Sequence, residues 1–207
     1  MNSTLEIVEQ IKHSLDFMTV FQQLQEAVEA EKAKRQEFYD LIHENVNAEF
    51  INGEIILHSP VMRRHWRVSS ALSARMINHV EENDLGEVGV EKVMIRLTRN
   101  DYEPDIVFFK KDKSDLFTEK QLLFPAPDLI VEILSESTKK NDRTIKFEDY
   151  ARHDVKEYWI IDPEKKCFEQ YINQNNAYEL YQKLTGKGLL QSMVIDGFFL
   201  SIEDVFR

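Results

Sequence analysis

Two acidic residues of this chain lie within short apolar segments, and a lysine follows them. Asp105 belongs to the segment EPDIVFF, Glu132 belongs to PDLIVEIL, and Lys146 comes later in the chain. An unpaired charge buried in a strand interior costs several kcal/mol, so the two carboxylates indicate a function. Two carboxylates on adjacent strands beside an ammonium group can hold a divalent metal ion and orient water, which is the chemistry of phosphodiester cleavage.

Strand alternation favours a shared site for these carboxylates. Pro104 restricts Glu103 to an extended backbone and so sets the start of the first strand. Glu132 and Asp128 share one face of the second strand, and if the two strands pair in register, Asp105 meets Glu132 at one end of the sheet. Their like charges repel unless a cation lies between them. The oxygen ligands favour Mg²⁺ or Mn²⁺ over zinc. In the alternative, each carboxylate caps a turn or pairs with an arginine.

Three further residues are candidates for the site, and each has a structural alternative. Lys146 either stabilises and orients an attacking hydroxide or forms an i,i+4 ion pair with Asp142, worth a few tenths of a kcal/mol. Glu54, which follows an Asn-Gly turn, either has a catalytic role through metal or water or is simply exposed. His65 either contacts phosphate and positions water or lies on the surface.

The net charge of −11 argues against a general nucleic-acid-binding protein, because such proteins carry a basic surface. The charge is unevenly distributed, however: residues 1–50 hold 10 acidic and 4 basic side chains, and residues 59–80 hold no acidic side chain. Two basic clusters are therefore expected to flank the site and contact phosphates. They are Arg63, Arg64 and Arg67 in the first, and Lys139, Lys140 and Arg143 in the second. In the alternative, they form solvated helix faces.

Hydrophobic periodicity predicts the elements that position these residues. Residues 3–45 have helical spacing and predict an acidic arm of two helices. The period then changes to two, and Asn52-Gly53 predicts a hairpin. Further helices are predicted over 66–80 and 141–153, and strands over 88–98, 103–109, 125–135 and 155–163, followed by short strands. This order predicts an α/β fold with a mixed sheet, in which strand 125–135 is central and covered on both faces.

The bulk composition is that of an ordinary globular protein. A length of 207 residues suits one domain with an appendage. The single cysteine, Cys167, excludes an internal disulfide and fits a reducing compartment. Neither a long apolar run nor a signal peptide is present, so we expect a cytoplasmic protein without a membrane partner.

Several segments together resemble one known family. They are FINGEIILHSP, His65, YEPDIVFF, PAPDLIVEILSEST, DRTIKFEDYA, VKEYWIIDP and IEDVF. In this order they resemble the Uma-two family of restriction-endonuclease-like proteins, within the PD-(D/E)XK nuclease superfamily. The resemblance implies a restriction-endonuclease-like α/β core over residues 49–207. Residues 1–48, predicted as a helical N-terminal extension from their periodicity, depart from the shorter start that is usual in the family.

The resemblance also implies roles for individual residues. Asp105 matches the first metal-binding aspartate and Glu132 the acidic residue of the second motif, while the superfamily pattern adds the main-chain carbonyl of Ile133 as a metal ligand. The standard motif has a lysine at position 134, where this chain has Leu134. The resemblance implies that the lysine has moved to the following helix, as Lys146.

Two main hypotheses follow for the function. The first is an endonuclease that hydrolyses DNA with Mg²⁺ or Mn²⁺ and acts as a homodimer. The second is a catalytically silent module that keeps the nuclease fold and binds nucleic acid or a protein partner; the acidic balance and the displaced lysine favour it. A third reading is a structural protein that forms homo-oligomers through the helical arm.

Overall fold

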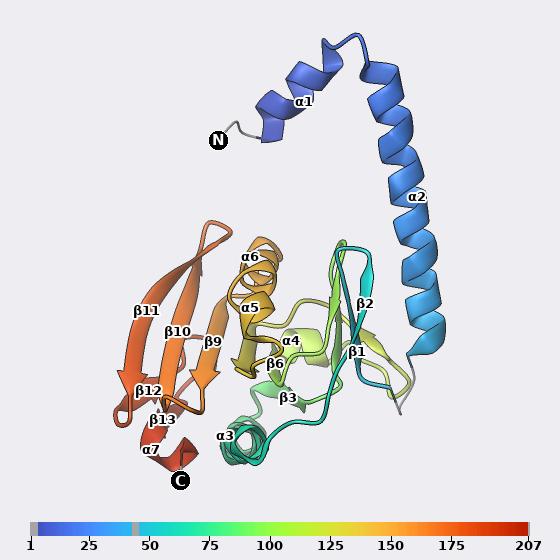
Figure 1. The fold of residues 1–207 in the computed structure, drawn as a ribbon. Helices are drawn as coiled ribbons and strands as arrows, with labels where there is room; N and C mark the ends of the chain where they lie inside the picture. Colours follow the sequence, from blue (N-terminus) through green and yellow to red (C-terminus); the bar gives the residue numbers. More distant parts are fainter. Residues whose placement is uncertain (1–3, 43–45, 207) are drawn as a thin grey trace. The chain divides into compact units, whose positions relative to one another are not determined.

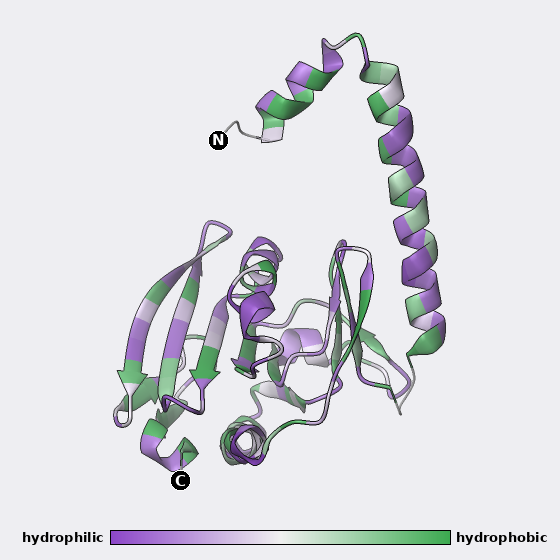
Figure 2. Ribbon diagram, in the orientation of Figure 1, coloured by the Kyte–Doolittle hydropathy of each residue, from purple (hydrophilic) through white to green (hydrophobic). Residues whose placement is uncertain are grey.

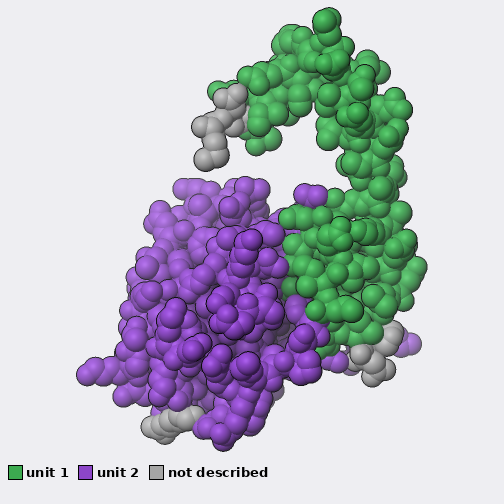
Figure 3. Space-filling view, in the orientation of Figure 1, with its two compact units in different colours: residues 1–57 green, residues 58–207 purple. Residues whose placement is uncertain are grey.

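The structure is a computed structural model that describes residues 4–42 and 46–206. The chain forms two compact units, residues 1–57 and residues 58–207, which Figure 3 colours separately. The division after residue 48 that the sequence suggests stays a prediction.

The first unit consists of two helices and a hairpin. Helix α1 (Thr4–Lys12) and helix α2 (Phe17–Leu41) correspond to the two predicted helices, although residues 3 and 43–45 of that prediction lie outside the described residues. Among its described residues α1 buries no side chain, and α2 buries only Phe38, which packs 5.7 Å from Phe50 between ring centroids. Figure 2 shows hydrophobic and hydrophilic residues interspersed along both helices.

The hairpin forms where the Asn-Gly pair predicts it. Strand β1 (Ala48–Ile51) pairs antiparallel with β2 (Glu54–Leu57), so that two residues make the turn. Asn52 and Gly53 have φ angles of +51° and +83°. Two consecutive left-handed residues give the tight turn whose twist suits a hairpin, and Asn followed by Gly tolerates this conformation best.

The second unit is built on a six-stranded sheet in the order β11-β10-β9-β8-β6-β3 (Figure 1). The strands are β3 (Gly86–Val90), β6 (Ile106–Lys110), β8 (Leu129–Ile133), β9 (Glu157–Asp162), β10 (Cys167–Gln174) and β11 (Ala177–Thr185). Strands β8 and β9 are parallel and the other neighbours antiparallel, which confirms the predicted mixed sheet. All five residues of β8 are buried, as expected of a central strand.

Shorter elements complete this unit. Strand β4 (Met94–Arg96) pairs antiparallel with β5 (Asp101–Tyr102) and parallel with β7 (Leu123–Phe124). Strands β12 (Leu189–Gln191) and β13 (Phe199–Ser201) form a hairpin. The short helices are α4 (Lys111–Ser114) and α7 (Ile202–Val205). None of the helices in the described part of the chain is long and apolar enough to cross a membrane.

Two predicted elements are each divided in the structure. The strand predicted over 88–98 was wrong as one element, because Glu91 and Lys92 have φ angles of +48° and +56° and end β3 before β4 begins. Left-handed residues cannot continue an extended ladder. The helix predicted over 141–153 is likewise two helices, α5 (Lys139–Asp142) and α6 (Ile145–Arg152), separated by the non-helical Thr144.

Helices cover both faces of the large sheet. Helix α3 (Arg63–Glu82) starts earlier than predicted, and its apolar side chains join the core formed by one sheet face. These side chains are Val68, Leu72, Met76 and Val80. Helix α6 covers the opposite face, where the rings of Tyr150 and Tyr158 lie 5.4 Å apart. Strand β8 therefore turns alternate residues toward two different helices.

Candidate active site

The two carboxylates predicted to share a site lie at the same end of strands β6 and β8. Ile106 pairs with Val131 in the antiparallel register, so one further step brings Asp105 opposite Glu132. Directly opposite residues of an antiparallel pair project from the same face of the sheet. The side chain of Asp105 is 18% exposed, whereas that of Glu132 is only 5% exposed. One carboxylate is thus open to solvent at the edge of the site and the other is buried behind it.

Helix α6 brings a buried ammonium group to Glu132. The Nζ atom of Lys146 lies 3.0 Å from Glu132 Oε1, and the Tyr150 hydroxyl donates a hydrogen bond of 2.9 Å to the same oxygen. Lys146 and Tyr150 are one helical turn apart, so both side chains project from the same face of α6. Lys146 also lies 3.4 Å from Asp142 Oδ1 and 5.7 Å from the ring centroid of Tyr102.

Asp105 is held from two sides. The Ile133 amide donates a hydrogen bond of 2.7 Å to Asp105 Oδ2, and His65 Nε2 lies 3.2 Å from Asp105 Oδ1. Burial lowers the pKa of His65, but the hydrogen bond and charge of Asp105, together with the main chain of Ile133, outweigh burial and raise this pKa. His65 is therefore a buried group in the first turn of α3 that is aimed at the candidate site.

The oxygen atoms gathered here suit a hard divalent cation. No group of three or more His, Cys, Asp or Glu in residues 4–42 and 46–206 could hold a metal ion. A cation at this place would therefore depend on Asp105 and Glu132, with a main-chain carbonyl such as that of Ile133 and water as its remaining ligands. Mg²⁺ keeps several waters and is bound through one or two carboxylates, so the residues present fit Mg²⁺ or Mn²⁺.

The hydroxyl of Tyr158 is buried beside this group of residues and donates a hydrogen bond to the main-chain carbonyl of Asp142. Burial raises the pKa of the Tyr158 hydroxyl well above its usual value, and the negative charges of Glu132 and Asp142 raise it further.

Asp128, one of the predicted site residues, is not brought to this place. Asp128 lies at the opposite end of β8 from Glu132, where it accepts a hydrogen bond from the Lys110 amide and pairs with Lys113 at 3.0 Å. Glu54 belongs to the first unit, where its exposed carboxylate pairs with Lys34 at 2.8 Å.

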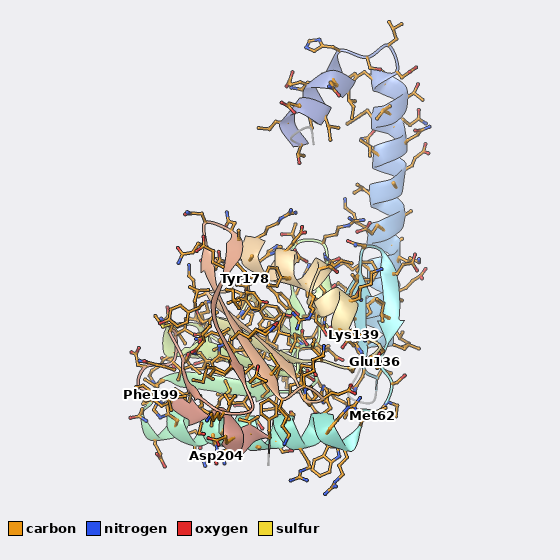
Figure 4. The ribbon with its side chains drawn as sticks, turned by 60° about the vertical axis from the view of Figure 1, so that its left-hand side comes forward. Met62, Glu136, Lys139, Tyr178, Phe199 and Asp204 are labelled. Atoms are coloured by element: carbon orange, nitrogen blue, oxygen red, sulfur yellow. The ribbon has the colours of Figure 1, made fainter. Side chains whose placement is uncertain are left out.

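Three of the predicted phosphate contacts line a pocket of about 320 Å³. Arg64, Lys139 and Arg143 line it together with Ser135, which lies two residues beyond Ile133. Each of these cations is paired with a carboxylate: Arg64 with Glu164 at 3.5 Å, Lys139 with Glu136 at 2.8 Å and Arg143 with Glu169 at 2.6 Å. Figure 4 labels the Glu136 and Lys139 pair. Arg63, Arg67 and Lys140 are exposed and do not line the pocket.

Tyr150 was not among the predicted site residues, and Asp142 was predicted only as an alternative ion-pair partner of Lys146. In the structure both are buried beside Lys146 and Glu132. The sequence feature that could have identified them is their spacing: Asp142 lies four residues before Lys146 and Tyr150 lies four residues after it. This spacing places the three residues on one side of the α5–α6 segment.

A mixed α/β sheet flanked by helices, with two carboxylates ending adjacent strands, is the arrangement of the restriction-endonuclease-like class. The Uma2 family, described as "Putative restriction endonuclease", matches residues 35–203, and the chain belongs to this family. The resemblance was expected to begin at residue 49. The match instead starts earlier, at residue 35 within helix α2. Membership in this family supports a nuclease function for the chain.

One solved structure establishes the fold independently. It is described as "a putative nuclease belonging to DUF820 from Anabaena variabilis" and superposes with a TM-score of 0.70. The two sequences are 22% identical, and the match covers 83% of this chain and 96% of that chain. The comparison with curated proteins gives no match.

Proposed function

We propose that this protein is a metal-dependent endonuclease that hydrolyses phosphodiester bonds of DNA in the cytoplasm. In this proposal Asp105, Glu132 and the main-chain carbonyl of Ile133 hold Mg²⁺ or Mn²⁺. The observation that carries the proposal is the buried contact between Lys146 and Glu132, at the strand end where Asp105 lies opposite. A buried ammonium beside two carboxylates has no evident purpose in packing, because removing such charges from water is costly.

The residues of the chain then divide the catalytic work. A bound divalent cation would polarise the scissile phosphate and lower the pKa of a coordinated water. The ammonium group of Lys146, which lies beside Glu132 and Asp142, stabilises negative charge on the attacking oxygen and on the phosphate. Tyr150 fixes the orientation of Glu132, and the Ile133 amide fixes that of Asp105. His65 positions Asp105 and lies within reach of a phosphate or of water.

The basic residues around the site supply contacts to the DNA backbone. Arg64, Lys139 and Arg143 line the pocket beyond β8 and can exchange their carboxylate partners for phosphate oxygens. Arg63, Arg67 and Lys140 extend the basic surface on α3 and α5. Asp128 is proposed as a support that anchors the start of β8.

The central test of this proposal is the substitution Glu132→Ala. We expect the variant to lose Mg²⁺-dependent nicking of supercoiled plasmid by about a hundredfold or more, because the cation loses a ligand and Lys146 loses its partner. Nicking is measured on agarose gels with Mg²⁺ and with chelator.

Glu148→Ala is the matched control, since Glu148 is an exposed glutamate of α6 that forms an ion pair with Arg152. Equal nicking by Glu132→Ala and the unmodified protein would rule out the proposed site.

A second candidate function is a silent nuclease-fold module that binds nucleic acid or a protein. The ion pairing of Arg64, Lys139 and Arg143 and the net charge of −11 favour this alternative. Calorimetry discriminates the two functions. The silent module binds neither Mg²⁺ nor Mn²⁺, and its affinity for DNA or for a protein partner is the same in Asp105→Asn.

We also propose that the active form is a homodimer assembled through helix α2. Phe17, Phe21, Leu24 and Val28 recur at alternating spacings of four and three residues and are between 38% and 55% exposed. This narrow apolar stripe is typical of a helix that packs against another helix.

Leu24→Glu is therefore expected to halve the mass measured by light scattering, because it places a charge in the stripe. The control Gln23→Glu adds the same charge outside the stripe and should leave the mass unchanged. A monomeric mass for the unmodified protein would refute the dimer.

A further inference from the structure

Lys146 is shared by two buried carboxylates that differ in their relation to the proposed cation. Its Nζ atom lies 3.0 Å from Glu132 and 3.4 Å from Asp142, and the three side chains are 2%, 5% and 1% exposed, respectively. Glu132 is a proposed ligand of the cation, whereas Asp142 lies at the end of α5 and has no part in the proposed reaction. One ammonium thus stands between two negative charges of different function.

A cation bound to Glu132 would share the carboxylate that is also a counter-charge of Lys146. A buried ammonium without a full counter-charge is strongly unfavourable, and here it would also face a divalent ion of the same sign. Asp142 provides a counter-charge that the cation does not use. With Asp142 present, Lys146 would keep a counter-charge if Glu132 bound a metal ion.

The fold fixes Asp142 for this purpose. The Tyr158 hydroxyl, from the sheet, donates a hydrogen bond of 3.0 Å to the main-chain carbonyl of Asp142. The break at Thr144 then lets α6 start in a new direction while Asp142 and Lys146 remain in contact. The main chain at Asp142 is therefore held by a hydrogen bond from the sheet.

We infer that Asp142 is a positioning residue that retains Lys146 when a divalent cation binds Glu132, and that it thereby sets the affinity of the site for the cation. The inference rests on the proposed function only in that Glu132 is taken as a ligand. Asp142 could also attract the cation directly through its charge. Direct attraction does not require Lys146, whereas retention of Lys146 does, so removal of the lysine separates the two effects.

The experiment is a double-mutant cycle in which Mn²⁺ affinity is measured by calorimetry. Asp142→Asn is expected to weaken Mn²⁺ binding about tenfold or more, as for other residues that support metal ligands. In the Lys146→Met background the same substitution should change the Mn²⁺ affinity by about twofold or less, because there is then no lysine for Asp142 to retain. Glu148→Gln, an exposed acid on α6, is the matched control and should leave binding unchanged.

Each other outcome has a distinct meaning. Equal weakening by Asp142→Asn in both backgrounds overturns the inference in favour of direct attraction, and no weakening in either background overturns it outright. If the unmodified protein binds no Mn²⁺, the proposed function itself fails. Should Asp142→Asn not fold, crystals of the unmodified protein with Mn²⁺ decide the question. Lys146 is expected to keep its contact with Asp142 and move away from Glu132; movement away from Asp142 overturns the inference.

Discussion

Lys146→Met is expected to slow DNA cleavage by about a hundredfold or more while binding Mn²⁺ at least as tightly as the unmodified protein. Methionine fills nearly the same buried volume as lysine but carries no charge, so the packing against Tyr102 is retained. The reaction then loses the ammonium that stabilises the developing negative charge. The metal ion, in contrast, loses a neighbouring positive charge that repels it, and its affinity should rise.

Single-turnover cleavage and calorimetry on the same protein sample measure these opposite effects. Lys156→Met is a suitable control, because Lys156 is an exposed lysine that pairs with Asp154 just before β9. If Lys146→Met cleaves DNA as fast as the unmodified protein, the lysine serves only to neutralise buried acids, and the catalytic role assigned to it is wrong.

Glu157→Gln is expected to lower the free energy of unfolding by about 3 kcal/mol, although Glu157 has no part in the proposed reaction. Glu157 is fully buried, and both of its oxygens accept hydrogen bonds. The donors are Trp159 Nε1, Gln170 Nε2, Ser192 Oγ and the amides of Met193 and Val194. A glutamine offers one acceptor oxygen, and its amino group would face donors that then lack a partner.

Urea unfolding at neutral pH measures this loss. Glu179→Gln on β11 is the control, since Glu179 is exposed and the same change there should alter stability by about 0.5 kcal/mol or less. A change at Glu157 as small as that control value would mean that the segment 192–194 is held to the sheet by its apolar contacts rather than by the carboxylate.

The sequence was informative where local chemistry decides the structure. The Asn52-Gly53 pair predicted the hairpin because few other residue pairs accept two left-handed positions. The apolar run around Glu132 predicted a central strand because only a strand covered on both faces buries consecutive residues. In both cases a short stretch of chain contains all the information that is needed.

Other features depend on contacts that spacing along the chain does not reveal. Alternation placed Asp128 and Glu132 on one face of a strand, but it cannot tell which end of the strand meets Asp105; that depends on the register with β6. Glu91 and Lys92 fit a strand by periodicity, and only the path of the chain between two sheets requires their left-handed backbone. The carboxylates around Lys146 come together because α6 packs over β8.

The position of the lysine on a helix rather than on the strand has a consequence for finding related chains. When acid and amine share a strand, they must be two residues apart, and a linear pattern detects them. In this chain the amine approaches from an eight-residue helix, and Leu134 is free to line a pocket instead. Searches based on linear motifs would overlook such a chain, whereas searches based on three-dimensional proximity of a buried amine and a buried acid would detect it.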